Sequence, residues 1–103
     1  MDTYLSSVTL PETVRPAGPA KDTICSQLNR LSKTLSKTKN KGLRRWLKAN
    51  EDVTEFTDMF ELIDHVKRLK NIIQRSHEKA TKNDERAFII CCALLYRLTR
   101  MLR

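Results

Sequence analysis

Apolar residues recur at helical intervals in three separate segments of the chain. In the first segment the intervals are four, three and four positions, which places the apolar side chains on one side of a helix. Asp22 or Thr23 is expected to cap the N-terminus of this helix. The predicted stripe consists of Ile24, Leu28, Leu31 and Leu35.

A polar stretch from Ser36 to Gly42 interrupts this pattern. Asn40 and Gly42 are poor helix formers, so the first helix is expected to end here and a short second helix to follow around residues 43–49. The alternative is one long helix that continues through both residues. The two possibilities place the basic residues of this region differently.

A third helix is predicted to begin at Asn50, which would act as its N-cap, with Glu51 and Asp52 in its first turn. Apolar residues at helical spacing then continue for more than five turns and define the side that packs. They are Val53, Phe56, Met59, Phe60, Ile63, Val66, Leu69, Ile72 and Ile73.

The last helix is predicted from about Asp84 to the C-terminus, with candidate caps in Thr81-Lys-Asn-Asp. Residues 87–96 are apolar on all sides of a helical wheel, which indicates that other helices or a second subunit enclose them. Three or four helices cannot easily surround this segment in so small a monomer. A homodimer formed through the last helix is therefore expected.

The N-terminal residues 1–20 differ from the rest of the chain. They contain all three prolines together with several Ser and Thr residues, so a flexible arm is predicted. Residues 21–103 are predicted to form one helical domain, because 103 residues suffice for one modest core but not for two. The expected fold is an all-α, three- or four-helix bundle with a flexible N-terminal arm.

Charge is concentrated in one part of this domain. Residues 21–48 contain nine basic residues and one acidic residue, and so carry the net charge of +8 of the whole chain. If one helix continued through Gly42, most of these side chains would lie within about 60° of Arg30 on the helical wheel and form a single ridge. The ridge would consist of Arg30, Lys33, Lys37, Lys41, Arg44, Arg45 and Lys48.

Such a ridge suits the phosphate backbone of a nucleic acid, which Lys and Arg contact without distinguishing bases. Trp46 would lie on the apolar side of the same wheel, where core packing is favoured over stacking on a base. A structural alternative also exists. In it, the acidic residues from Glu51 to Asp64 fold back in a hairpin and neutralise the ridge internally.

The pattern gives no support for catalysis. His65 lies beside Asp64 and one turn after Glu61, an arrangement typical of a surface ion pair, and no nucleophile accompanies it. His77 does not share a helix face with His65, and the spacing of Cys25, Cys91 and Cys92 is not that of a zinc site. Buried thiols, no metal and no cofactor are expected.

The longest apolar run has ten residues, too few to cross a bilayer, and no secretory leader is evident. Three cysteines cannot all pair within one chain, which favours a reducing cytoplasmic or nuclear location. The sequence therefore predicts a non-catalytic protein that binds nucleic acid, with RNA favoured over DNA because no module that reads the major groove is apparent.

The main alternative is a helical protein–protein interaction adaptor, whose basic stripe would meet an acidic protein surface. Small basic helical proteins are frequent among viral accessory proteins, an analogy of size and charge that allows either function. An acidic membrane surface is a weaker third option, because bulky insertion residues do not accompany the stripe.

Overall fold

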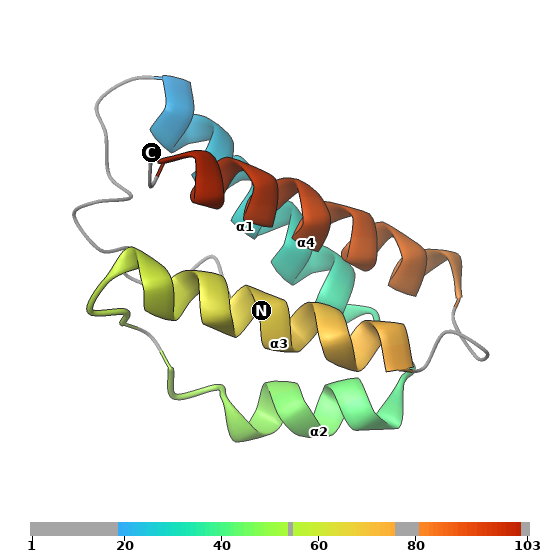
Figure 1. Ribbon diagram of the computed structural model, residues 1–103. Helices are drawn as coiled ribbons and strands as arrows, with labels where there is room; N and C mark the ends of the chain where they lie inside the picture. The colour runs from blue at the N-terminus through green and yellow to red at the C-terminus, as the bar shows by residue number, and fades with distance from the viewer. Residues whose placement is uncertain (1–18, 54, 76–80, 102–103) are drawn as a thin grey trace.

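A computed structural model describes residues 19–53, 55–75 and 81–101, which contain four α-helices (Figure 1). The helices are α1 (Pro19–Ser36), α2 (Lys41–Ala49), α3 (Met59–Arg75) and α4 (Lys82–Met101). The all-α prediction is confirmed. Residues 1–18 of the predicted arm lie outside the described residues, whereas Pro19 and Ala20 form the start of α1, where proline is well tolerated.

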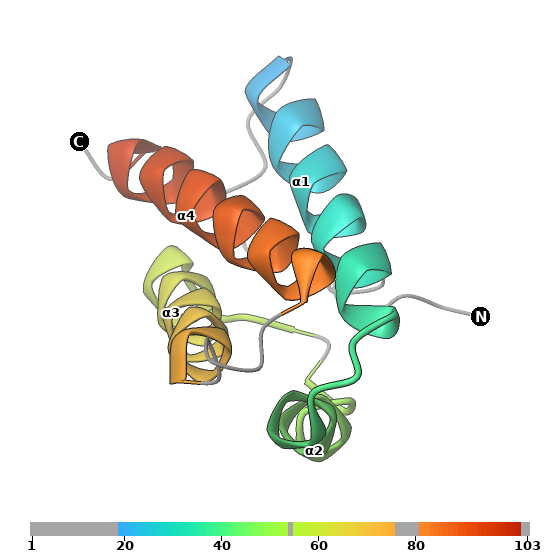
Figure 2. The ribbon, with the colours of Figure 1, turned by 90° about the vertical axis from the view of Figure 1, so that its right-hand side faces the viewer.

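α4 packs against both α1 and α3, and α2 packs against α3 beneath the C-terminal end of α1 (Figure 2). α1 and α4 run antiparallel. At one end, the Asn83 side chain at the start of α4 donates a hydrogen bond to the Thr34 carbonyl near the end of α1, at 2.8 Å. At the other end, Ile24 of α1 and Met101 of α4 line the same depression.

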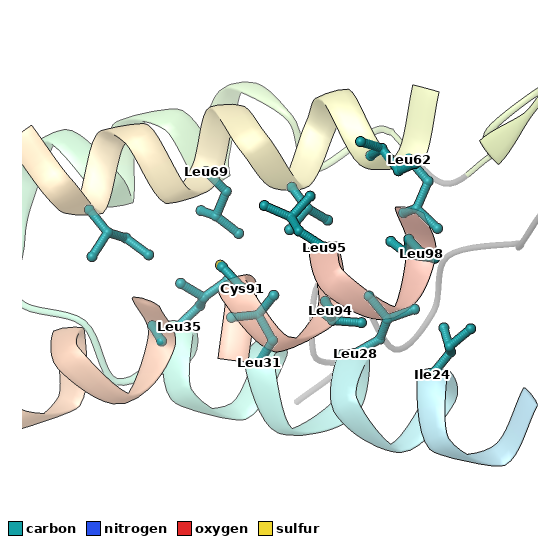
Figure 3. Close-up of a cluster of buried hydrophobic side chains, with 14 of the residues drawn as sticks. Ile24, Leu28, Leu31, Leu35, Leu62, Leu69, Cys91, Leu94, Leu95 and Leu98 are labelled. Carbon is teal, nitrogen blue, oxygen red and sulfur yellow. The ribbon is translucent and has the colours of Figure 1, made fainter. Parts of the chain in front are cut away.

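The core is built mainly from leucine side chains of α1, α3 and α4, which converge between the three helices (Figure 3). All four members of the predicted first stripe are buried, which confirms the face through which α1 packs. α2 adds one fully buried side chain, Leu43. Burial of this apolar surface is the main favourable contribution to folding.

A polar contact ends α1. Thr38, in the turn between α1 and α2, is only 2% exposed, and its hydroxyl donates to Asp84 Oδ1 at 3.1 Å. The same hydroxyl accepts a hydrogen bond from the Asn40 backbone N–H at 3.2 Å, and Asn40 Oδ1 accepts from the Leu43 N–H as the N-cap of α2. The predicted break between two helices is confirmed, and the single long helix is wrong.

Asp84 is 3% exposed and takes part in the N-terminal cap of α4 as well. Its backbone N–H donates to the Thr81 hydroxyl, and the Thr81 N–H donates in return to Asp84 Oδ2, both at 3.3 Å. This reciprocal pair is a capping box, so Thr81 is the one of the candidate caps that the structure uses. One carboxyl group thus joins the start of α4 to the end of α1.

The predicted start of the third helix is wrong. Asn50 is the C-cap of α2, where its side-chain amide donates to the Trp46 carbonyl at 2.8 Å. α3 begins only at Met59, after Asp58 accepts a hydrogen bond from the Glu61 N–H at 2.9 Å. The helical spacing of apolar residues includes Phe56 although this residue is not in a helix. Phe56 belongs to the segment that connects α2 to α3, and its side chain is buried in the core.

The single chain does not enclose the last helix on all sides, as expected for so small a monomer. α1 and α3 cover one part of α4, but Ile89 and Tyr96 are 65% and 62% exposed and Cys92 is exposed too. These residues lie on the far side of α4 from Leu94 and Leu98 in the core. Homodimerisation through α4 stays a prediction.

Replacing Thr38 by valine keeps the side-chain shape but removes the hydroxyl that Asp84 and Asn40 share. We expect Thr38→Val to lower the free energy of unfolding by about 1–3 kcal/mol, because buried polar groups lose their partner. Urea unfolding followed by circular dichroism measures the change. Thr99→Val, which removes an exposed hydroxyl bonded to the Leu95 carbonyl, is the matched control and should cost at most about 0.5 kcal/mol. Equal losses in the two variants would contradict the role given to Thr38.

Candidate nucleic-acid interface

The turn at Thr38 divides the seven predicted site residues between two helices. Arg30 and Lys33 belong to α1, Lys37 follows directly after its end, and the remaining four belong to α2. All seven side chains are exposed. The condition for a single continuous ridge is therefore not met, because the helix that would have aligned the seven residues ends at Ser36.

The larger group forms what we call the α2 basic face: Lys41, Arg44, Arg45 and Lys48. At about 100° per residue these four positions fall within an arc of roughly 100°. The opposite side of α2 carries Leu43, which is buried, and Trp46 and Leu47, which are half-buried against the core. α2 is thus a two-sided helix whose exposed side carries four cations and no acidic residue.

Aromatic packing fixes α2 against α3. The Trp46 and His65 ring centroids are 4.8 Å apart, and His65 in turn meets Phe56 edge-on at 5.2 Å. The Trp46 ring therefore packs against α3, in agreement with the favoured core interpretation. Stacking of Trp46 on a base has no observation in its support.

A hydrogen bond also positions one member of the α2 basic face. Arg44 Nε donates to the Thr38 carbonyl at 2.9 Å, which ties the guanidinium group to the turn between α1 and α2. Arg44 is nevertheless exposed, so its charge contributes to the field at the surface. The turn at Thr38, which separates α1 from α2, thus also orients the Arg44 side chain.

The alternative of internal neutralisation is not what the described residues show. Within residues 24–53, 55–75 and 81–101, the ion pair closer than 4 Å is Arg68 with Asp64, at 3.1 Å within α3. Asp58 and Glu61 instead accept hydrogen bonds from backbone N–H groups at the start of α3. The acidic residues from Glu51 to Asp64 therefore form no salt bridge with the α2 basic face in this part of the chain.

His65 corrects another expectation. It is not a surface residue but is 8% exposed, between Trp46 and Phe56. Burial lowers the pKa of His65 from 6.5 to about 4; Arg68 acts in the same direction and Asp64 opposes it. The imidazole is neutral near pH 7 and serves as a packing element under α2.

Sequence reasoning missed the surroundings of Arg30 and Lys33. Both residues line a shallow depression of about 520 Å³ together with Arg86, Ile89 and Ile90 of α4. A second depression of about 460 Å³ follows it along the same pair of helices, and its lining includes Tyr96, Arg97 and Arg100. We call the two depressions together the α1–α4 groove. Arg86, Arg97 and Arg100 were overlooked because the apolar run between them dominated the pattern, although their spacing places them on one side of α4.

The cysteines differ from one another. Cys91 is buried, as predicted, and burial, with a smaller contribution from Cys92, raises its pKa to about 12. Cys92 is exposed, so the expectation of buried thiols is wrong for this residue. Among the described residues, no three His, Cys, Asp or Glu side chains lie together as a metal site would require.

In the described part of the chain, each helix is too short or too polar to cross a lipid bilayer. Comparison with known protein families, curated proteins and solved structures finds no match to this chain.

The buried His65 makes stability depend on pH. Its pKa in the folded protein lies below that of the unfolded chain, so the unfolded state binds more protons between about pH 4 and 6.5. Stability should therefore be fully present above pH 6.5 and fall on acidification towards pH 4, by about 3 kcal/mol from this group. Urea unfolding between pH 4.5 and 7.5 measures the loss. The variant His65→Gln should show a much flatter profile over that range, and an unchanged profile would contradict the assignment to His65.

Proposed function

We propose that this protein is a non-catalytic nucleic-acid-binding protein whose α2 basic face contacts the phosphate backbone. The observation that supports the proposal most is the two-sidedness of α2. Four cations occupy the exposed edge of a nine-residue helix, and the opposite edge is fixed by Leu43, Trp46 and the ring of His65. Cations held on a fixed helix lose less conformational freedom on binding than cations on a mobile chain.

The length of α2 sets the size of the contact. Nine residues span roughly 13 Å. Duplex DNA carries one charge per ~1.7 Å of helix axis, so the length of this face is sufficient to reach four phosphates. Because the face has four cations, it contacts at most about four phosphates. Such binding is weak, depends strongly on salt and does not read sequence.

RNA is favoured over DNA in this proposal because no element with a known major-groove geometry supports DNA recognition. Lys37 and Lys39 extend the positive charge from the α2 basic face to the turn after α1. Arg30 and Lys33, by contrast, belong to the α1–α4 groove and are not required for the contact at α2. The unpaired thiols of Cys25, Cys91 and Cys92 favour a reducing compartment inside a cell.

Fluorescence anisotropy with a labelled 20-nucleotide RNA tests the proposal. We expect Arg45→Glu combined with Lys48→Glu to weaken binding by about tenfold or more, since both side chains are exposed and two attractive contacts become repulsive. For the unaltered protein, the logarithm of affinity should fall with the logarithm of salt concentration with a slope of about −3, as four single-strand contacts require.

The matched control is Lys67→Glu combined with Arg75→Glu, which makes the same change of net charge at exposed positions of α3. This control should weaken binding far less than the α2 variant. Equal weakening in the two variants would mean that net charge, and not the α2 basic face, determines RNA affinity. An unaltered protein that does not bind RNA at low salt would contradict the proposed function outright.

A further inference from the structure

The α1–α4 groove carries two of the three large apolar side chains that are most exposed in the described chain. Ile89 and Tyr96 are 65% and 62% exposed and lie seven positions, or about two turns, apart on the same side of α4. The third such residue, Phe60, lies on α3 and is 66% exposed. Scattered exposed apolar residues are ordinary, but two that line one groove indicate a surface for contact with another molecule.

The charged residues that line the groove are all cations. Its lining includes Arg30, Lys33, Arg86, Arg97 and Arg100, and none of the lining residues in the described part of the chain is acidic. This concentration is separate from the α2 basic face, because it is built by α1 and α4 while α2 packs on α3. An occupant of the groove must therefore combine apolar surface with negative charge.

Arg100 and Tyr96 form a fixed unit at one end of the groove. Arg100 Nη1 donates to the Tyr96 hydroxyl at 2.9 Å, and its Cζ lies 5.4 Å from the centre of the Tyr96 ring. The two contacts hold a guanidinium group and an aromatic ring in one arrangement before any partner arrives. Such preorganisation lowers the entropy that binding would otherwise lose.

The shape of the groove matches a helix. Its lining residues belong to α1 and α4, two antiparallel helices (Figure 2), and α4 extends roughly 22 Å from Arg86 to Met101. A helix of about four turns has the same length, and grooves between helices commonly bind amphipathic helices through apolar residues at i, i+3, i+4 and i+7.

We propose that the α1–α4 groove binds an acidic amphipathic α-helix of a partner protein. Leucine-like side chains of that helix cover Ile89 and Tyr96, and its Asp and Glu residues pair with the cations of the rim. A second copy of this chain is a poorer occupant, because a two-fold interface would place the same five cations opposite one another. Nucleic acid would satisfy the cations but would leave the aliphatic side chain of Ile89 without a suitable partner.

A labelled 18-residue peptide tests this proposal by fluorescence anisotropy with the full chain. The peptide has Leu at the helical a, d and e positions and Glu or Asp elsewhere, and a scrambled peptide of the same composition lacks the apolar face. The first should bind and the scrambled one should bind at least about tenfold more weakly. Equal binding of both would overturn the proposal, because charge alone would then account for the affinity.

Variants locate the contact. Ile89→Ser combined with Tyr96→Ser should weaken peptide binding by about tenfold or more, as expected for exposed apolar residues at the centre of an interface. Phe60→Ser, which removes an equally exposed apolar side chain from α3, is the matched control and should leave binding nearly unchanged. Loss in both variants, or in neither, would contradict the assignment to the groove.

A second pair of variants tests the charge. Arg86→Glu combined with Arg97→Glu should abolish peptide binding but leave most of the RNA binding. Arg45→Glu combined with Lys48→Glu should weaken RNA binding but leave most of the peptide binding. All four residues are exposed, so the fold is expected to persist, and thermal unfolding by circular dichroism verifies this. Peptide binding that survives without any RNA binding would contradict the proposed function alone and support the groove.

Two outcomes would reassign the groove. Sedimentation equilibrium could detect a dimer that is absent in Ile89→Ser combined with Tyr96→Ser. That result would show that a second copy of the chain occupies the groove, and it would overturn the proposal. If RNA displaces the peptide and the same variant loses RNA affinity, nucleic acid occupies the groove. This result would also overturn the proposal. A monomer whose bound peptide is not displaced by RNA supports the proposal.

Discussion

The hydrogen bond from the Thr38 hydroxyl to the Asp84 carboxyl group determines how the charged part of this molecule is arranged. Both groups are almost fully buried, and a buried polar group without a partner is costly, so the pair fixes the position of the turn against the start of α4. Asp84 simultaneously completes the cap of α4, and Thr38 accepts from Asn40, the cap of α2. One contact therefore coordinates an end of each of three helices.

The functional consequence follows from the direction in which α2 leaves this turn. A straight continuation of α1 would have placed the seven predicted site residues on one ridge, but α2 instead crosses to α3 and packs there through Leu43 and Trp46. Positive charge is thereby distributed over two surfaces of different character. The exposed side of α2 carries four cations without a large apolar side chain, whereas the α1–α4 groove combines cations with exposed large apolar side chains. Different surfaces of this kind suit different partners.

The sequence predicted the parts of the structure that depend on local pattern. The apolar stripe of α1, the break before Gly42 and the Thr81 cap of α4 all follow from spacing and capping preferences over a few residues. The start of α3 was mispredicted because Val53 and Phe56 keep helical spacing while they reach the core from a connecting segment. Periodicity reports that a side chain is buried, not which backbone conformation buries it.

Features that depend on long-range contacts could not be predicted from local patterns in the sequence. Nothing near His65 indicated that Trp46 and Phe56 would cover it, and the polar neighbours Glu61 and Asp64 suggested the opposite. The cations of the α1–α4 groove come from helices some fifty residues apart in the chain, so only the antiparallel packing of α1 and α4 brings them together.

The central claim is that the basic segment is split by a turn and does not form one helix. Backbone Cα chemical shifts of isotopically labelled protein test this most directly, because they report the conformation of each residue. A split basic segment should give helical values up to Ser36, non-helical values from Lys37 to Asn40, and helical values again from Lys41 to Ala49. Uninterrupted helical values from Arg30 to Lys48 would contradict it and restore the single ridge.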